Sequence, residues 1–251
     1  MKFLPNTGNF VFRSLGLALV FIFGGLGVLG SGGGEESPPA PLPDQDPTGI
    51  WDGTYTNLNA GLFPIKAIIY NDRWILFSDT YLSNPADGIL WDGNMTVFSN
   101  QFTGNLKNYQ FESYSYTLSY TGEVSSKDHI WGDADSDPLR FFSLNYLAIS
   151  DDGASLLTLE GNWNFSNLSF NLDISIDQSG VLSGLDSDGC FYNGSVTVPD
   201  PHINVYQLTI TKSSCDAKNG NYSGLGYVVG GDFIYAFSNE SYAMYGKLGK
   251  M

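Results

Sequence analysis

Three carboxylates occupy alternate positions near the middle of the chain, at Asp133, Asp135 and Asp137. Acidic residues at this spacing are typical of calcium-binding loops, whose ligands are oxygen atoms. The loop pattern is incomplete, because Pro138 stands where such a loop has a glycine and Leu144 stands where it has a final glutamate. An acidic hairpin between two strands accounts for the same residues, and we therefore predict no metal site.

Few other residues have types and spacing that suggest catalysis. Asp186 and Asp188 flank a turn before Cys190, and paired carboxylates can hydrolyse glycosidic bonds, but neighbours at a hairpin tip are typical solvated turn formers. His129 and His202 are the only histidines, and neither has a nucleophile or metal motif beside it, so both are expected in exposed loops. We predict no catalytic residue and no cofactor, and an enzyme is the third of three hypotheses.

The chain contains two cysteines, Cys190 and Cys215. In an exported protein an even count indicates one disulfide. Two free buried thiols are the alternative. A metal site is a weaker alternative, because neither histidine lies at a ligand-like spacing from either cysteine.

Aromatic residues are abundant, with 17 Phe, 15 Tyr and 5 Trp. Some of them could line a ligand cavity or, if exposed, stack on sugars. An eight-stranded barrel is barely wide enough for its own side chains, so the same rings could instead fill its interior. The aromatic residues in question are Tyr55, Trp74, Trp91, Tyr114, Tyr116 and Tyr120.

Strands must position these residues, because no segment from Gly49 onward shows sustained helical periodicity. Apolar residues alternate with polar ones at Leu172, Ile174 and Ile176, and the same period of two recurs elsewhere. Tight-turn pairs such as Asn71-Asp72 separate these segments. The pattern predicts an all-β fold. Further alternating runs begin at Tyr114 and Tyr206, and further turns contain Asp87-Gly88, Asp152-Gly153, Ser179-Gly180, Asp188-Gly189, Asn219-Gly220 and Gly230-Gly231.

The chain also resembles itself. Gly49-Ile50-Trp51 corresponds to Gly161-Asn162-Trp163, and Asp128-His129-Ile130 corresponds to Asp232-Phe233-Ile234 at an offset of 104 residues. We interpret this as two copies of one unit of about 100 residues, at 49–150 and 156–251, although glycine-rich strands can also match by chance.

Each copy divides into about eight short strands. Eight antiparallel strands with tight turns favour an up-and-down barrel, because closure leaves no unpaired edge, and a sandwich is the alternative. In the second copy the strands are expected near 157–166, 167–176, 180–187, 190–198, 204–213, 220–229, 232–238 and 242–249.

The Gly-x-Trp motif at the start of each copy, Gly49/Trp51 and Gly161/Trp163, resembles that of the lipocalins and their calycin relatives. In that fold the tryptophan closes one end of the barrel and the glycine lets the chain pass close to it. The resemblance implies two tandem lipocalin-like barrels with these four residues as barrel-closing motifs. Other lipocalin motifs are not evident.

The N-terminal segment predicts that the protein is exported from the cytoplasm. Lys2 and Arg13 accompany an uncharged run at 14–30, which would span about 25 Å as a helix, less than the membrane core of about 30 Å. Residues 1–30 therefore fit a signal peptide, with a retained membrane anchor as the alternative. Residues 31–48 are rich in Gly, Pro and acids and indicate a flexible linker.

Two further resemblances concern bacterial export. Val28-Leu29-Gly30-Ser31 resembles the lipobox of bacterial lipoproteins, but Ser31 stands where the lipidated cysteine would be. The second copy resembles proteobacterial secreted lipoproteins of unassigned function, in the stretch 187–195, at Asn204-Val205-Tyr206 and in the stretch 219–224. The likeness supports the Cys190–Cys215 bridge and a bacterial envelope location.

The net charge of the chain limits the classes of partner that it could bind. Among 251 residues, 26 acids face 11 bases, a net charge of −15, which excludes ordinary nucleic-acid binding. Six Asn-x-Ser/Thr sequons are expected to be ordinary turn and strand residues in a bacterial chain, and glycan sites only in a eukaryotic secretory one. They are Asn94, Asn164, Asn167, Asn193, Asn221 and Asn239.

From these observations we expect an exported protein of the periplasm or outer cell envelope that is not an enzyme. The first hypothesis is a binding protein whose partner is an envelope protein or a small apolar ligand. The second is a purely structural envelope protein with solidly packed barrels. Membrane association is expected only through the N-terminal segment.

Overall fold

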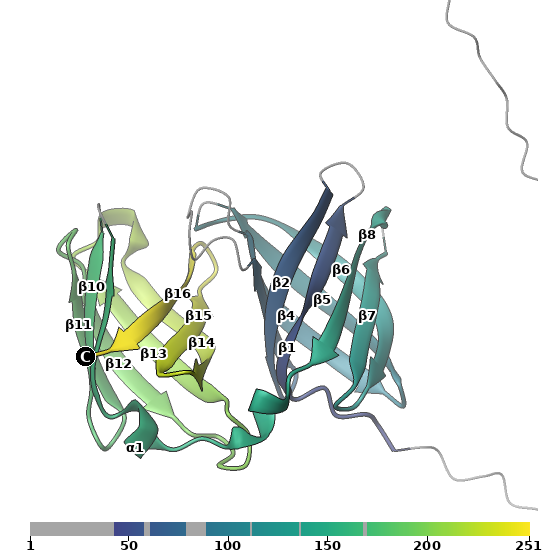
Figure 1. Cartoon of the computed structure of the whole chain (residues 1–251). Helices are drawn as coiled ribbons and strands as arrows, with labels where there is room; N and C mark the ends of the chain where they lie inside the picture. Colours follow the sequence, from purple (N-terminus) through teal and green to yellow (C-terminus); the bar gives the residue numbers. More distant parts are fainter. Residues whose placement is uncertain (1–42, 58–60, 79–88, 111, 136, 168–169) are drawn as a thin grey trace, which may run out of the picture. The chain divides into compact units, whose positions relative to one another are not determined.

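The computed structural model describes residues 43–57, 61–78, 89–110, 112–135, 137–167 and 170–251. They form two closed eight-stranded antiparallel barrels in tandem, so the predicted all-β barrel fold is confirmed and the sandwich alternative is wrong (Figure 1). The expected leader at 1–30 and the linker as far as residue 42 lie outside the described residues.

In the first barrel every strand pairs with its sequence neighbours, and β1 also pairs with β8 along seven residues, from Trp51 opposite Tyr146 to Asn57 opposite Arg140. The strands are β1 (Gly49–Asn57), β2 (Gly61–Tyr70), β3 (Arg73–Ser78), β4 (Ile89–Phe98), β5 (Gln101–Gln110), β6 (Ser113–Ser125), β7 (His129–Ala134) and β8 (Asp137–Tyr146).

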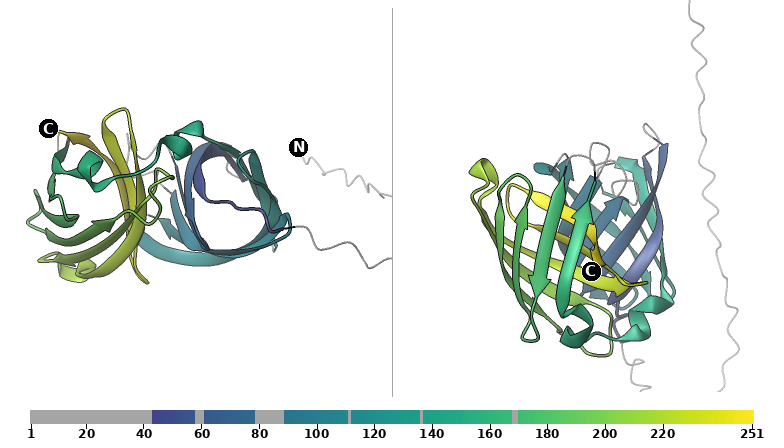
Figure 2. Two further views of the ribbon diagram at one scale, coloured as in Figure 1. Left: turned by 90° about the horizontal axis from the view of Figure 1, so that it is seen from below. Right: turned by 60° about the vertical axis from the view of Figure 1, so that its left-hand side comes forward.

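The second barrel repeats this order. Its closure is shorter, because β9 and β16 pair only at Asn164 opposite Gly249 and Trp163 opposite Lys250. Seen from below, the strands of each barrel form a ring (Figure 2). The strands are β9 (Gly161–Ser166), β10 (Asn171–Ile176), β11 (Val181–Asp186), β12 (Phe191–Thr197), β13 (Tyr206–Ser213), β14 (Gly220–Val229), β15 (Asp232–Ser238) and β16 (Ala243–Lys250).

Two expected boundaries differ from the structure. The strand expected at 157–166 is wrong in its first part, because α1 (Leu156–Leu159) precedes β9. Ser155 starts this helical turn by accepting a hydrogen bond from the Thr158 N–H at 3.2 Å, as an N-cap residue does. Short 3-10 helices, η3 (Ala148–Asp152) and η4 (Asp216–Lys218), lie in the connections.

The end of the expected linker also belongs to the folded part. Pro47 is buried, and the Asp46 N–H donates to Ser126 Oγ at 2.6 Å. The Gln45 N–H donates to the carbonyl oxygen of Ser99 at 2.7 Å. Residues 44–47 therefore lie against the first barrel instead of extending away from it.

The alternation of apolar residues produces the barrel interiors. Leu172, Ile174 and Ile176 on β10 are buried inside the second barrel, while the residues between them are exposed. Side chains alternate between the two faces of a strand, so a period of two puts every second residue inside.

Two strands are buried on both faces. On β3, Trp74 points into the first barrel, while Ile75 belongs to a separate apolar cluster that includes residues of both barrels. On β15, Phe233 and Ile234 divide in the same way. This inter-barrel cluster consists of Ile50, Ile68, Ile75, Phe77, Leu90, Tyr109, Val205, Leu225, Tyr227, Ile234, Ala236, Ala243 and Tyr245.

Candidate functional site

The interior of the first barrel is filled by side chains. Tyr55, Trp74, Trp91 and Tyr120 lie in its core and are at most 4% exposed. The ring centroids of Tyr55 and Trp91 are 4.8 Å apart, and those of Trp74 and Tyr120 are 6.2 Å apart. These four candidate aromatics therefore pack against one another, as the narrow-barrel interpretation predicts.

The other two candidate aromatics do not lie in this core. Tyr114 is 45% exposed, and its hydroxyl group lies 3.2 Å from Thr117 Oγ1. Tyr116 is half-buried, and its hydroxyl oxygen accepts hydrogen bonds from Asn108 Nδ2 and Arg140 Nη1, both at 3.0 Å.

The second barrel encloses a hollow of about 20 Å³ among apolar side chains that include Leu172, Tyr192 and Phe233. Such a volume holds about one water molecule. Ligand pockets are commonly ten times larger or more, so this hollow has no room for the small apolar ligand that the sequence suggests.

The second barrel also contains a buried lysine on β13. Lys212 is 4% exposed, and its Nζ atom lies 5.0 Å from the ring centroid of Tyr192 and 3.4 Å from Met244 Sδ. Burial lowers the pKa of Lys212, while the carboxylates of Asp186 and Glu112 act in the opposite direction. Burial and a hydrogen bond to Asp186 raise the pKa of Tyr192.

Asp186 is not the solvated turn residue that the sequence suggests. It is 5% exposed, and its carboxylate accepts hydrogen bonds from the Cys190 N–H at 2.9 Å and from the Tyr192 hydroxyl at 2.8 Å. Its partner in the proposed pair, Asp188, is exposed. The Asp188 N–H is a third donor to this carboxylate. The three hydrogen bonds replace those that water would make to Asp186, and they hold the turn in place.

The predicted disulfide between Cys190 and Cys215 is confirmed, with Cα atoms 5.0 Å apart. It joins the residue before β12 to the connection between β13 and β14. The bridge therefore lies beside the turn that Asp186 organises.

The two Gly-x-Trp motifs adopt the same geometry. Trp51 and Trp163 are at most 1% exposed. Trp51 Nε1 donates to the Pro47 carbonyl oxygen at 2.9 Å, and Trp163 Nε1 donates to the Leu159 carbonyl oxygen at 2.7 Å, four residues back in each copy. Gly49 and Gly161 both have positive φ angles, 147° and 128°.

The remaining candidates do not come together. His129 begins β7, where its Nε2 atom lies 2.9 Å from Ser143 Oγ, so it is not the loop residue expected, whereas His202 is an exposed loop residue as predicted. Among the described residues, no three His, Cys, Asp or Glu side chains lie close enough to hold a metal ion. Asp133 and Asp135 stand at the end of the β7–β8 hairpin, and the side chain of Asp137 lies outside the described part.

The sequons lie in strands or turns. Asn94, Asn164, Asn193 and Asn221 belong to strands, and Asn167 and Asn239 follow strand ends.

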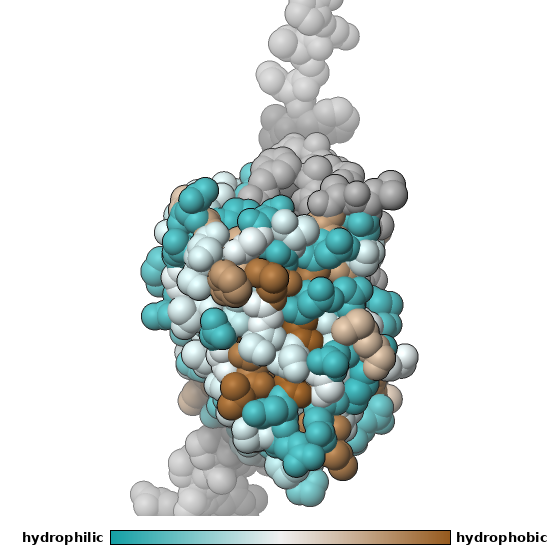
Figure 3. Space-filling model, turned by 90° about the vertical axis from the view of Figure 1, so that its left-hand side faces the viewer, coloured by the Kyte–Doolittle hydropathy of each residue, from teal (hydrophilic) through white to brown (hydrophobic). Residues whose placement is uncertain are grey.

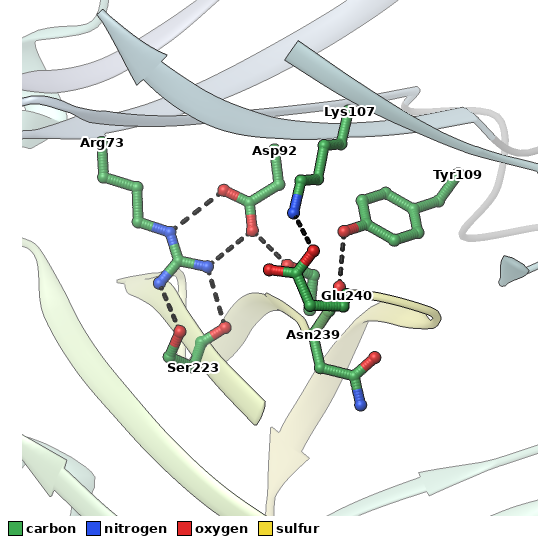
Figure 4. A network of polar contacts seen from close by, with 8 residues as sticks. Arg73, Asp92, Lys107, Tyr109, Ser223, Asn239 and Glu240 are labelled. Carbon is green, nitrogen blue, oxygen red and sulfur yellow. Dashed lines mark hydrogen bonds and ion pairs between the residues drawn. The ribbon is translucent and has the colours of Figure 1, made fainter. Parts of the chain in front are cut away.

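The strongest candidate site lies outside the barrels, where β3, β4 and β5 of the first meet β14 and β15 of the second (Figure 4). Arg73 on β3 binds Asp92 on β4 through two hydrogen bonds, from Nε to Oδ1 at 3.0 Å and from Nη2 to Oδ2 at 2.6 Å. Asp92 is 6% exposed, so a two-point contact with a guanidinium replaces most of its hydration.

The same pair reaches the second barrel. Arg73 donates to Ser223 on β14, from Nη1 to Oγ and from Nη2 to the carbonyl oxygen, both at 2.9 Å. Ser238 Oγ on β15 donates to Asp92 Oδ2. Arg73 and Asp92 therefore join the barrels by polar contacts beside the apolar inter-barrel cluster.

A second set of polar contacts lies close by (Figure 4). Lys107 Nζ is 2.5 Å from Glu240 Oε2, and the Tyr109 hydroxyl donates to the Asn239 carbonyl oxygen at 2.6 Å. Burial raises the pKa of Tyr109 to about 12, with the negative charges of Asp92 and Glu240 acting in the same direction and the Ser238 hydrogen bond opposing them.

These contacts surround a cleft of about 450 Å³ between the barrels. Its charges form two pairs, Arg73 with Asp92 and Lys107 with Glu240, so its net charge is zero. It is otherwise lined by amide, hydroxyl and backbone groups, which can donate and accept hydrogen bonds. The remaining lining residues are Gly93, Asn94, Asn105, Tyr109, Thr117, Ser223, Ser238 and Asn239.

The outer face of the second barrel is different in character. Figure 3 shows apolar side chains gathered in patches among hydrophilic ones. Leu185 and Phe191 stand opposite each other on β11 and β12 and are 46% and 49% exposed. With Met251 they line a shallow hollow of about 380 Å³.

Sequence reasoning missed the cleft residues Arg73, Asp92 and Glu240. A signal was present in the apolar runs after Arg73 and Asp232, which do not alternate as a half-exposed strand does. Such runs indicate burial on both faces, and charged residues beside them are candidates for an interface.

No family model, no curated protein and no solved structure matches this chain. Across the described ranges, no helix has the length and apolar character needed to cross a membrane. The chain is therefore an all-β protein of two tandem closed barrels with a neutral, polar cleft between them.

Proposed function

We propose that this chain is an exported cell-envelope binding protein without catalytic activity, and that it binds a small, uncharged, polar molecule in the cleft between its barrels. The observation that carries the proposal is the contrast between the filled barrel interiors and the cleft of about 450 Å³. The cleft offers amides and hydroxyls from both barrels, while its paired charges attract neither cations nor anions.

Export is proposed from sequence and disulfide together. The uncharged run at 14–30 suggests a signal peptide or anchor, and the Cys190–Cys215 bridge is compatible with a periplasmic or extracellular location. We propose a bacterial envelope from the resemblance noted in the sequence alone, in the stretches 187–195 and 219–224.

Native mass spectrometry of the protein purified from its own host tests the proposal. We expect a bound mass that survives gentle desolvation and is lost from the Asn94→Ala variant, since Asn94 lines the cleft. Asn193→Ala, on the outer face of the second barrel, is the matched control and retains the ligand. Recovery of the apo mass alone from wild-type protein contradicts the proposal.

The second candidate is a purely structural envelope protein. The inter-barrel cluster favours it, because Ile50, Ile68, Ile75 and Ala236 are completely buried there and bind the barrels together. Under this alternative no small molecule accompanies the purified protein, and the cleft variants change stability alone.

A further inference from the structure

Two rows of outward-facing side chains cross the first barrel from β4 to β7. The first row contains, in strand order and each opposite the next, Phe98, Gln101, Glu123 and Trp131. The second row, one pleat further along, contains Thr96, Thr103, Thr121 and Asp133. Together these rows line a hollow of about 470 Å³ on the outside of the barrel.

The first row has an exposed aromatic ring at each end. Phe98 is 76% exposed and Trp131 is 42% exposed. Neighbouring strands lie about 4.8 Å apart, so about 14 Å of sheet separates the two residues. Rings at this spacing offer two apolar faces to a ligand longer than a single sugar ring.

Unused hydrogen-bond acceptors lie between and beside these rings. Glu123 is directly opposite Trp131, and Asp133 follows Trp131 on the same face of β7. Within the described part of the chain, neither carboxylate has a hydrogen-bond or ion-pair partner. Hydroxyl groups that donate to carboxylates form short, strong hydrogen bonds, so a polyhydroxylated ligand would use both acids.

The charges that line the hollow further restrict the chemical class of ligand that it could bind. Its lining includes Glu123 and Asp133 and no Lys, Arg or His. An anionic ligand would be repelled. An apolar protein segment would remove water from both carboxylates without replacing their hydrogen bonds, which is unfavourable. The suitable ligand has apolar ring faces, many hydroxyl donors and no negative charge.

We propose that this face of the first barrel binds a neutral oligosaccharide, with sugar rings stacked on Trp131 and Phe98 and hydroxyls donating to Glu123 and Asp133. The site goes beyond the proposed function, because it lies on one barrel and includes no residue of the cleft.

Calorimetric titration of the full chain tests the proposal. The probes are cellotriose, maltotriose and triacetylchitotriose as neutral trisaccharides, with trigalacturonate as the anionic comparison. At least one neutral trisaccharide is expected to bind with a Kd of about 1 mM or tighter. Absence of binding by all three overturns the proposal, and so does equal binding of the anionic probe.

Matched variants locate the binding. Trp131→Ala is expected to weaken it at least about tenfold, and Glu123→Gln should weaken it several-fold because the acceptor loses its charge. Phe191→Ala removes an aromatic side chain of the second barrel that is 49% exposed, against 42% for Trp131, and leaves sugar binding unchanged. Unchanged binding by Trp131→Ala overturns the proposal. Asn94→Ala also leaves sugar binding unchanged, so failure of the cleft proposal and failure of this one are distinguishable.

Discussion

Arg73 and Asp92 lie on neighbouring strands of the first barrel, joined by two hydrogen bonds, and each also contacts a serine of the second barrel. An ion pair at such a junction does more than neutralise charge. It places complementary donors and acceptors where two otherwise apolar strand surfaces meet, and so restricts how the barrels can pack.

Asp92→Asn is expected to lower the free energy of unfolding by about 2 kcal/mol, because Arg73 loses its charged partner in a mostly buried place. Urea unfolding measures the change. Asp188→Asn, an exposed acid in a turn, is the control and changes stability little. Equal effects of the two substitutions would show that the pair contributes nothing to the junction.

Gly49→Ala is expected to lower the free energy of unfolding more than Gly161→Ala does. Both glycines have a φ angle that L-residues rarely adopt, but a Cβ at Gly49 would lie 2.5 Å from Tyr146 Cε2, whereas at Gly161 it would lie 3.2 Å from the flexible end of Lys250. We expect losses of about 2 and about 1 kcal/mol, measured by thermal and urea unfolding. The reverse order would mean that backbone strain, and not the Tyr146 contact, decides the effect.

Removing the disulfide with the double substitution Cys190→Ala/Cys215→Ala is expected to destabilise the second barrel by about 3.5 kcal/mol, since the bridge closes a loop of intermediate length. Fluorescence and near-ultraviolet circular dichroism follow unfolding with and without reductant. Reductant should lower the stability of the wild-type protein and leave the double variant unaffected. A wild-type protein insensitive to reductant would contradict a stabilising role for this bridge.

Lys212→Met is expected to raise the free energy of unfolding by about 1 kcal/mol at neutral pH, because a buried charge beside Met244 and Tyr192 is replaced by an apolar chain of similar length. Burial lowers the pKa of Lys212 below its ordinary value of 10.5, against the charges of Asp186, Glu112 and Asp188 and with that of Lys218. Between the pKa of Lys212 in the folded protein and 10.5, the unfolded chain binds more protons than the folded one. The free-energy cost of burying the charged lysine therefore decreases as pH rises through this range.

The advantage of Lys212→Met should therefore shrink toward pH 10.5, which urea unfolding across a pH series measures. A constant advantage at every pH would attribute the gain to packing and not to charge.

Alkaline pH should weaken the inter-barrel contact through Tyr109. Its pKa is raised from 10.0 to about 12, so this group's contribution is fully present below pH 10 and is lost as pH rises toward 12. Tyr109→Phe is expected to lower stability by about 1 kcal/mol at neutral pH, through loss of the hydrogen bond to Asn239, and to flatten the profile between pH 10 and 12. If stability falls as steeply with pH in Tyr109→Phe as in the wild-type protein, other tyrosines cause the loss of stability at alkaline pH.

The amino-acid sequence alone was enough to predict the all-β class of fold. The alternation at Leu172, Ile174 and Ile176, the tight turns and the paired Gly-x-Trp motifs are local signals, and local signals suffice to predict strands and hairpins. The even cysteine count likewise indicated the Cys190–Cys215 bridge. Expected positions of later strands in the second copy lie within a few residues of those observed.

The alignment of the two repeats fails to predict which residue of a strand points into the barrel. The offset of 104 residues pairs Ile130 with Ile234, yet Ile130 lies inside the first barrel and Ile234 lies in the inter-barrel cluster. Phe233 is the residue that points inward on β15. A shift of one residue exchanges the two faces of a strand, and two apolar neighbours in sequence do not reveal which one points inward.

Which outer strand faces are shielded from water depends on the contact between the two barrels. Whether Ile75 meets water or the inter-barrel cluster, and whether Asp92 meets solvent or Ser238, depends on a second barrel more than a hundred residues away. Periodicity reports that a strand has two faces, but burial of the outer face is a property of the contact between barrels. The cleft and its paired charges follow from that contact. The apolar runs after Arg73 and Asp232 can signal an interface, but they do not reveal that Arg73 and Asp92 meet Ser223 and Ser238 of the other barrel.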